Sequence, residues 1–237
     1  MSNSIVLRPA EREDIARLAD IADAAFQSDA HTKLKALASK PSAFRDGMYE
    51  ALGIWRTHRK IDLIVAENQD NHELMGWVAW SRRGFPGDSD SSLPAITDED
   101  SSTIERGKTI KDLEALTNAS ISSWSTRLMP PGSRCRYIVA ISVDPASQSS
   151  GIGSRLVRWG TEKADGEPGV YCWVQSSMGG RPFFEKHGFA EVGRLELDLD
   201  EYSEGLRPSE GAESAGGAGA TWGKYIWTYM RRDAIAQ

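Results

Sequence analysis

The sequence predicts an α/β protein with a mixed, mostly antiparallel central sheet flanked by helices, and three patterns support this fold class. Short β-branched runs alternate with longer segments whose apolar residues recur at helical spacing. Two runs, 62–67 and 74–81, flank the turn-forming segment 68–72 and predict an antiparallel hairpin. A third run, 137–143, stops at Asp144-Pro145 and leads through a glycine-containing loop into a helix.

The other elements follow from the same patterns. Apolar residues of the first helix, such as Ile15, Leu18 and Ile21, fall on one stripe. Outside the hairpin and the third run, we expect strands at 5–8, 170–174, 192–199 and 222–231 and helices at 14–26, 44–59 and 104–128.

Composition limits the classes of function. The chain has 237 residues, of which 40% are hydrophobic and 26% charged, which is ordinary for a soluble globular protein. A net charge of -6 does not favour nucleic acid as a partner. We see no apolar run of membrane-spanning length and no signal peptide, so we expect no membrane partner and a cytoplasmic location, with the nucleus left open. Two cysteines make no disulfide framework, and we expect no metal.

The junction after the third run has the chemistry of an anion-binding loop. Gly151 and Gly153 lack a β-carbon, so a ligand can approach the backbone closely. The first amides of the following helix have no acceptor within the helix and lie at the positive end of its dipole, which suits a phosphate or pyrophosphate. No Gly-Lys-Ser/Thr of a Walker loop follows, and the third glycine of a dinucleotide fingerprint would fall at Leu156. This pattern alone is also compatible with a tight turn that binds no ligand.

Four segments occur in an order that one known family of enzymes shares. Val143-x-Pro145 and then Gln148-x-x-Gly151-x-Gly153 lead into a helix. Residues 5–10, which contain the first strand, and residues 13–18, which contain the start of the first helix, precede this motif. The strand 170–174 follows it. Residues 180–189 then resemble a closing helix with a Tyr-Glu-Lys-x-Gly-Phe signature. Together these segments make the chain similar to the GCN5-related N-acetyltransferase (GNAT) superfamily.

The resemblance implies a sheet that is splayed between its two central strands, with the pantetheine arm of acetyl-CoA in the gap. It also implies that the acetyl group passes from acetyl-CoA, the co-substrate, to a primary amine by direct attack. We expect a small-molecule acceptor rather than a protein. The backbone amide near Val143 would polarise the thioester carbonyl. The cofactor-binding residues that the resemblance implies are Ile141, Ser142, Val143, Gln148, Ser149, Ser150, Gly151, Ile152, Gly153, Ser154 and Phe184.

The chain departs from the family at Phe184, where members often carry a tyrosine that is offered as the general acid. A phenyl ring donates no proton, so another group must serve. Ser177 follows the separated strand and could hydrogen-bond the leaving sulfur. Tyr137 is the second catalytic candidate, because some members place a base near this point, although an ordinary tyrosine pKa of about 10 makes a poor base. Glu67 and Glu73 of the hairpin are further candidates.

The predicted organisation is a single acetyltransferase-like domain over residues 1–237. Compared with a minimal member of the family, the chain carries an insertion at 82–132, made of a loop and a helix. This insertion is either a packing elaboration or, as we prefer, a wall or lid of the acceptor site. Residues 201–220 are rich in Gly, Ser, Ala and Glu and predict a flexible loop. A homodimer is possible because many relatives dimerise. Two alternatives remain: a non-catalytic CoA-binding or sensor protein of the same fold, and an unrelated nucleotide-binding enzyme.

Overall fold

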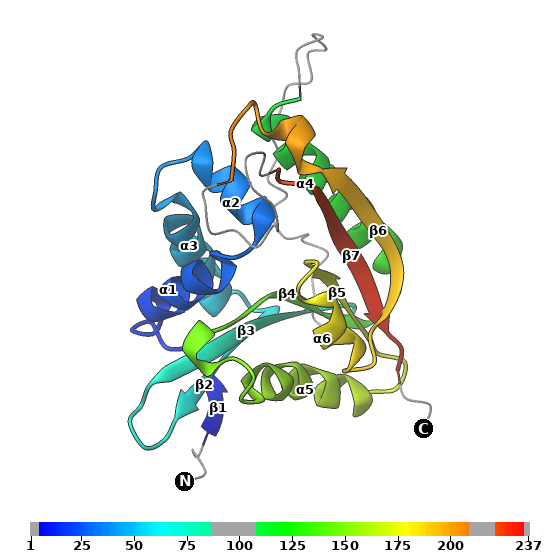
Figure 1. Ribbon diagram of the computed structural model, residues 1–237. Helices are drawn as coiled ribbons and strands as arrows, with labels where there is room; N and C mark the ends of the chain where they lie inside the picture. The colour runs from blue at the N-terminus through cyan, green and yellow to red at the C-terminus, as the bar shows by residue number, and fades with distance from the viewer. Residues whose placement is uncertain (1–4, 87–107, 209–220, 235–237) are drawn as a thin grey trace.

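A single seven-stranded sheet with helices on both faces forms the frame of the molecule (Figure 1). The computed structural model describes residues 5–86, 108–208 and 221–234. Its strands are β1 (Ile5–Pro9), β2 (Ile61–Asn68), β3 (Leu74–Arg83), β4 (Cys135–Val143), β5 (Tyr171–Ser176), β6 (Ala190–Asp198) and β7 (Lys224–Arg232). Its α-helices are α1 (Ile15–Phe26), α2 (Ala30–Leu37), α3 (Ala43–Thr57), α4 (Ile110–Leu128), α5 (Ile152–Asp165) and α6 (Arg181–Glu185).

The strands lie in the order β1-β2-β3-β4-β5-β7-β6. Only β4 and β5 run parallel to each other, and the other neighbours are antiparallel. The predicted mixed, mostly antiparallel sheet is therefore confirmed. β2 and β3 form the predicted hairpin and are buried over nearly their whole length, as their continuous apolar runs require.

The sheet opens between β4 and β5, as predicted. β5 pairs with β4 only from Cys135 to Ile138, and the rest of β4 pairs with β3 alone. The opening begins at a β-bulge: Ala140 lies opposite Ala79 and Ile138 opposite Trp80, so Val139 is the extra residue. A bulge increases the local twist of a strand. It thus separates the end of β4 from β5, and we call the resulting gap the fork.

The helices divide between the two faces of the sheet. α5 and α6 cover one face, where Leu156, Val157 and Phe184 pack against Trp80 and Ile138. α1 and α3 cover β2 and β3 on the opposite face. α4 covers β5 and β7 on that same face, through a cluster of aromatic and aliphatic side chains. In Figure 1, α1 and α3 stand at the left of the view and α4 stands at the upper right.

α2 is an element that the sequence patterns did not predict. The Asp29 side chain caps it by accepting a hydrogen bond from the Thr32 amide at 2.8 Å. The same carboxylate accepts a hydrogen bond from the Tyr225 hydroxyl of β7 at 2.7 Å. Leu34 packs into a cluster with Ile110 and Leu113 of α4. α2 therefore joins the N-terminal helices to β7 and α4.

The boundaries of the other elements differ from the predicted ones by small amounts. The helix expected at 104–128 is observed from Ile110, and residues 104–107 lie outside the described residues. Of the predicted insertion at 82–132, the first two residues belong to β3, and 87–107 lie outside the described residues. The predicted flexible loop at 201–220 begins inside a 3-10 helix, Leu199–Tyr202, and 209–220 are not described. Among the described helices, none is long and apolar enough to cross a membrane.

Candidate functional site

The edge of β4 presents free backbone groups to the fork. The Asp144 amide donates to the Met75 carbonyl of β3 at 2.9 Å. Because peptide groups alternate in direction along a strand, the amides of Ile141 and Val143 point away from β3 and toward the fork. The peptide groups of Ser142 point to β3, and its buried hydroxyl has no partner among the described residues. Two of the three predicted β4 residues therefore offer backbone to the fork.

The loop after β4 is held in shape by its own polar groups. The Asp144 carboxylate accepts from the Ala146 amide at 2.9 Å and from the Arg17 guanidinium of α1 at 2.5 Å. The Gln148 side chain donates to the Val143 carbonyl at 3.3 Å. Gly151 stands immediately before α5 with a φ of 84°, a left-handed conformation that glycine adopts without a steric penalty. The turn is therefore held by bonds that the chain makes within itself.

The amides of this loop are available to a ligand. The first hydrogen bond of α5 runs from the Arg155 amide to the Gly151 carbonyl at 3.1 Å. Among the described residues, no acceptor bonds to the backbone amides of residues 149–154. These amides lie at the positive end of a helix of 14 residues. A row of unpaired donors in this setting can bind a phosphate or pyrophosphate.

Phe183, which is not among the predicted site residues, lies against the start of α5. A β-carbon built at Gly153 would be 3.1 Å from the Phe183 ring. Phe184, the predicted residue, is instead 4% exposed and packs against Phe189 with ring centroids 5.6 Å apart. The side chain at the position of the family tyrosine is thus a core residue here. The signal that could have identified Phe183 is its place one residue earlier on the same short helix.

Tyr137 lies where β4 and β5 are still paired. It is opposite Trp173, and the two rings stack with centroids 4.9 Å apart. Burial raises the pKa of the Tyr137 hydroxyl, and a hydrogen bond with Ser81 only partly offsets this. The phenol is therefore protonated at neutral pH, when it can donate a proton but not accept one.

Ser177 follows directly after the last residue of β5, at the end of the strand that no longer pairs with β4. Its hydroxyl oxygen accepts a hydrogen bond from the Gly180 amide at 3.3 Å. Within the described residues, the Ser177 hydroxyl donates to no acceptor. This hydrogen is available to a further acceptor.

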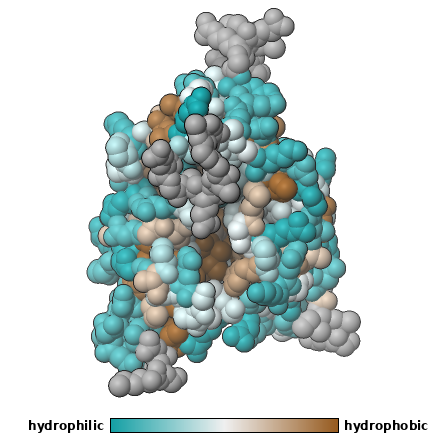
Figure 2. All heavy atoms as spheres, in the orientation of Figure 1, coloured by the Kyte–Doolittle hydropathy of each residue, from teal (hydrophilic) through white to brown (hydrophobic). Residues whose placement is uncertain are grey.

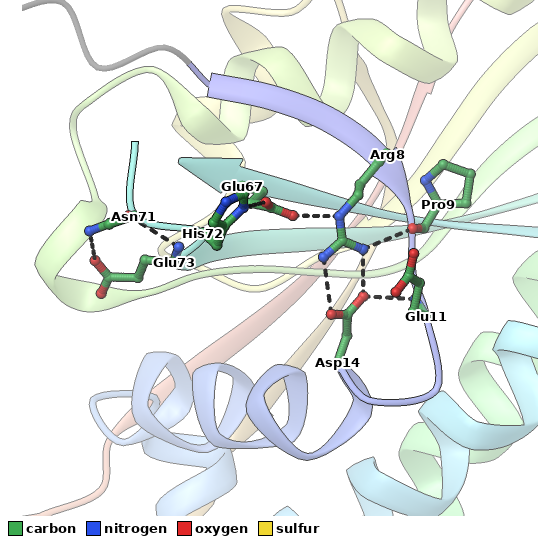
Figure 3. A network of polar contacts seen from close by, with 8 residues as sticks. All are labelled: Arg8, Pro9, Glu11, Asp14, Glu67, Asn71, His72 and Glu73. Carbon is green, nitrogen blue, oxygen red and sulfur yellow. Dashed lines mark hydrogen bonds and ion pairs between the residues drawn. The ribbon is translucent and has the colours of Figure 1, made fainter. Parts of the chain in front are cut away.

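Glu67, a further candidate for the base, is held in an ion network at the edge of the sheet (Figure 3). Its carboxylate bonds to Arg8 Nε at 2.5 Å and to His72 Nδ1 at 2.6 Å. Hydrogen bonds from His72 and Arg8 hold the pKa of Glu67 below its ordinary value. β2, which carries Glu67, is separated from the fork by β3 and β4. Both carboxylate oxygens of Glu67 are therefore already engaged in hydrogen bonds.

The face that carries the fork is hollowed. Figure 2 shows a depression between the two halves of this face, with hydrophobic residues at its floor and polar residues around it. The two cysteines, Cys135 and Cys172, are buried away from it, and burial raises the pKa of their thiols to about 11 and about 12. A reactive thiolate is therefore disfavoured at both positions. Among the described residues, no group of His, Cys, Asp and Glu could hold a metal ion.

Known proteins resemble this chain in sequence and in fold. The model of the acetyltransferase (GNAT) family matches residues 34–189. A solved structure of a mosquito arylalkylamine N-acetyltransferase like 5b is 16% identical with a TM-score of 0.55, and the match covers 97% of this chain and 100% of that chain. A histone acetyltransferase HPA2 and related acetyltransferase from Corynebacterium glutamicum is 14% identical with a TM-score of 0.53, covering 99% and 98%.

A third solved structure, an N-acetyltransferase from Staphylococcus aureus, is 14% identical with a TM-score of 0.50, covering 97% of this chain and 98% of that chain. At these identities the solved structures establish the fold alone. No curated protein matches the chain.

Proposed function

Because the chain belongs to the GNAT acetyltransferase family, we propose that it transfers an acetyl group from acetyl-CoA to a primary amine by direct attack. One observation carries the proposal: two sets of unpaired backbone donors lie next to each other. The amides of Ile141 and Val143 face the fork, and those of residues 149–154 surround the start of α5. An amide-containing arm suits the first set, and a pyrophosphate suits the second. Coenzyme A carries both groups in one molecule.

Different residues of the chain would bind acetyl-CoA and polarise its thioester carbonyl. Ile141 and Val143 bind the pantetheine arm through their backbone, and the Val143 amide polarises the thioester carbonyl. Acetyl-CoA supplies the activated acetyl group and a thiolate that leaves readily. The residues proposed to bind it are Ile141, Ser142, Val143, Gln148, Ser149, Ser150, Gly151, Ile152, Gly153, Ser154 and Phe184, with Phe183 added because it contacts Gly153.

Ser177 and Tyr137 are the proposed proton donors to the leaving thiolate. Ser177 is favoured because its hydroxyl lies beyond the last paired residue of β5 and has a hydrogen to donate. Tyr137 can serve only as a donor, since burial keeps its hydroxyl protonated. The acceptor is proposed to be a small-molecule amine, for which the net charge of -6 is suitable.

Isothermal calorimetry with acetyl-CoA and pure, folded protein tests the binding step. Gly153→Glu places bulk and negative charge among the loop amides, and we expect it to abolish binding. Gly132→Glu is the matched control for Gly151→Glu: both glycines have positive φ, 80° and 84°, and open space around a β-carbon. The control should bind acetyl-CoA like the wild type, whereas Gly151→Glu should not. A folded wild type that binds no acetyl-CoA would overturn the proposal.

A non-catalytic CoA-binding or sensor protein is the alternative, and the loss of the family tyrosine at Phe184 is the observation that favours it. Release of free thiol from acetyl-CoA separates the two functions. We expect amine-dependent thiol release with at least one amine of a panel containing phenethylamine, spermidine, glucosamine, glycine and a peptide with a free N-terminus. Binding without amine-dependent release by any of them would favour the sensor.

A further inference from the structure

α2 lies over the open end of the fork. β5 ends at Ser176, opposite Thr228 of β7, so residues 224–227 of β7 have no partner on the β5 side. α1 packs against β3 and β4, on the other side of the opening. The chain leaves α1 at Phe26 and three residues later bonds to Tyr225 of β7 through Asp29. The segment that begins α2 therefore crosses from one side of the fork to the other.

His31 stands in the first turn of this crossing helix. It is 6% exposed, and its Nε2 atom is fully buried with no hydrogen-bond partner among the described residues. Leaving a buried ring nitrogen without a partner costs free energy, which a structure tolerates where a ligand supplies the bond. His31 is thus a polar group whose Nε2 atom has no hydrogen bond within the described part of the chain, on the segment that crosses from α1 to β7.

Two aromatic rings of β7 enclose the imidazole. The centroid of the Tyr225 ring is 5.4 Å from that of His31, and the Trp227 ring stands edge-on to it at 5.3 Å. The Trp227 Nε1 atom is also buried and has no partner in the described part of the chain. Two unpaired polar atoms on neighbouring rings provide hydrogen-bonding sites in an otherwise apolar wall. This wall suits a primary amine on an aromatic or aliphatic body.

Burial, more than the charged groups around it, keeps the His31 ring neutral. Lys35 of α2 forms an ion pair with Glu114 of α4 at 2.9 Å, and Asp29 is engaged by Tyr225. Burial lowers the pKa of His31 to about 4, with a smaller contribution from Lys35, and Asp29 and Glu114 oppose the shift. A neutral imidazole has a lone pair to offer at neutral pH.

We propose that His31 accepts the proton of the attacking amine in a subsite walled by Tyr225 and Trp227, an inference that rests on the proposed function. The neutral amine nitrogen forms a bond to the thioester carbon, and its surplus proton passes to a ring nitrogen of His31. The carbon–sulfur bond then breaks, and the thiolate takes up a proton to give free CoA thiol. The amide and the thiol are the only products, and His31 returns its proton to solvent.

A weak base is sufficient here because the proton leaves the nitrogen only after the nitrogen–carbon bond has formed. An alkylammonium in solution holds its proton too firmly for such an imidazole, but a nitrogen bonded to the thioester carbon is far more acidic. The rate at low amine concentration should therefore rise with pH toward the pKa of the amine itself. No inflection near the ordinary histidine pKa of 6.5 is expected.

Kinetics of His31→Gln and His31→Phe with the five-amine panel provide the first test. His31→Gln keeps a hydrogen-bonding group and His31→Phe keeps a ring, but neither accepts a proton. We expect each to lower kcat roughly 100-fold, as expected for loss of a general base, with KM for acetyl-CoA changed less than about twofold. His58→Gln, at the end of α3, is the control and should keep the wild-type rate. A His31→Gln variant with more than about one third of the wild-type kcat would overturn the proposal.

Nitrogen-15 NMR of the histidine rings adds a measurement that needs no turnover. The His31 signals, assigned by their loss in His31→Gln, should show a neutral ring from pH 5.5 to 8 and should move when phenethylamine is added with CoA. They should not move with the corresponding alcohol. If acetyl-CoA binds but no panel amine moves these signals, the assignment of His31 is wrong and the proposed function stands. If acetyl-CoA does not bind, the proposed function is wrong, and unmoved signals would still reject the amine subsite.

Discussion

The indole of Trp80 occupies the space in which any side chain at Gly160 would have to lie. A β-carbon at Gly160 would be 2.1 Å from Cε2 of Trp80. The same indole donates from Nε1 to the carbonyl of Leu156 at 3.2 Å. α5 can approach the sheet this closely only because residue 160 is glycine. The contact holds α5, and with it the amides of the loop, against the β3–β4 side of the fork.

Gly160→Ala should therefore destabilise the protein by about 3 kcal/mol, because α5 or Trp80 must move to admit a methyl group. Gly53→Ala in α3 is the matched control, since a β-carbon there meets nothing within 4 Å. That variant should be more stable than the wild type by about 0.5–1 kcal/mol through helix propensity. Urea unfolding measures both changes, and a Gly160→Ala variant of wild-type stability would contradict close packing of Trp80 against Gly160.

The ion network of Arg8 gives a stability that depends on pH. Burial alone would raise the pKa of Asp14, but hydrogen bonds from Arg8 and the Glu11 amide hold it below its ordinary value. The pKa of Glu67 is lowered by His72 and Arg8. Carboxylates with lowered pKa stabilise the fold above their unfolded pKa, and this stabilisation is lost as the pH falls through the folded pKa.

Arg8→Met should cost about 2 kcal/mol at pH 7 and less at pH 3, because pH 3 lies below the unfolded pKa of both carboxylates and part of their stabilisation is already lost there. Arg45→Met, which removes an exposed pair with Asp20, should cost little at either pH. Urea unfolding at the two pH values makes the comparison. An equal cost of Arg8→Met at pH 3 and pH 7 would show that the ion pairs do not stabilise the fold.

The sequence predicted those parts of the fold that depend on local patterns. The hairpin of β2 and β3, the amphipathic α1 and the strand–loop–helix junction at Pro145 each have a periodicity or a turn signal of their own. α2 was missed because it has eight residues, of which only His31 and Leu34 are buried, too few to show a stripe. Its one local signal was Asp29, three residues before Thr32, in the pattern of an N-cap.

His31 provides a second test through stability, because its folded pKa lies below its unfolded one. The unfolded chain binds a proton near pH 6.5, whereas the folded chain does so near pH 4. Stability from the neutral ring is therefore present above pH 6.5 and lost as the pH falls toward 4. The wild type should lose up to about 3 kcal/mol over this range that His31→Phe does not lose. Parallel pH dependence of the two proteins in urea unfolding would show that His31 titrates as an exposed histidine.

Ser177→Ala and Tyr137→Phe separate the two proposed proton donors. We expect Ser177→Ala to lower kcat about tenfold, because it removes a hydrogen bond of roughly 1.4 kcal/mol to the developing thiolate. Tyr137→Phe should change kcat less than about threefold, since Tyr137 lies in the paired part of the sheet. Thiol release with acetyl-CoA and an active amine measures both rates. The opposite order of effects would make Tyr137 the donor.

The candidate site was predictable only as far as its chemistry is local. The amides of the loop follow from two glycines and a helix start, which are visible in the sequence. The bulge at Val139 is not visible there, because it depends on how β4 registers with β3. The burial of His31 arises from Tyr225 and Trp227, about 200 residues away along the chain. Likewise, which of Phe183 and Phe184 lies against the start of α5 depends on how the five-residue helix α6 is rotated about its axis.

The hydrogen bond between Asp29 and Tyr225 joins residues that are 196 positions apart. During synthesis on a ribosome, Asp29 emerges early, and nearly the whole remaining chain is translated before Tyr225 is made. The segment that begins α2 can reach its final place only after β7 has been translated. The wall over the fork is consequently among the last structures that the newborn chain can complete.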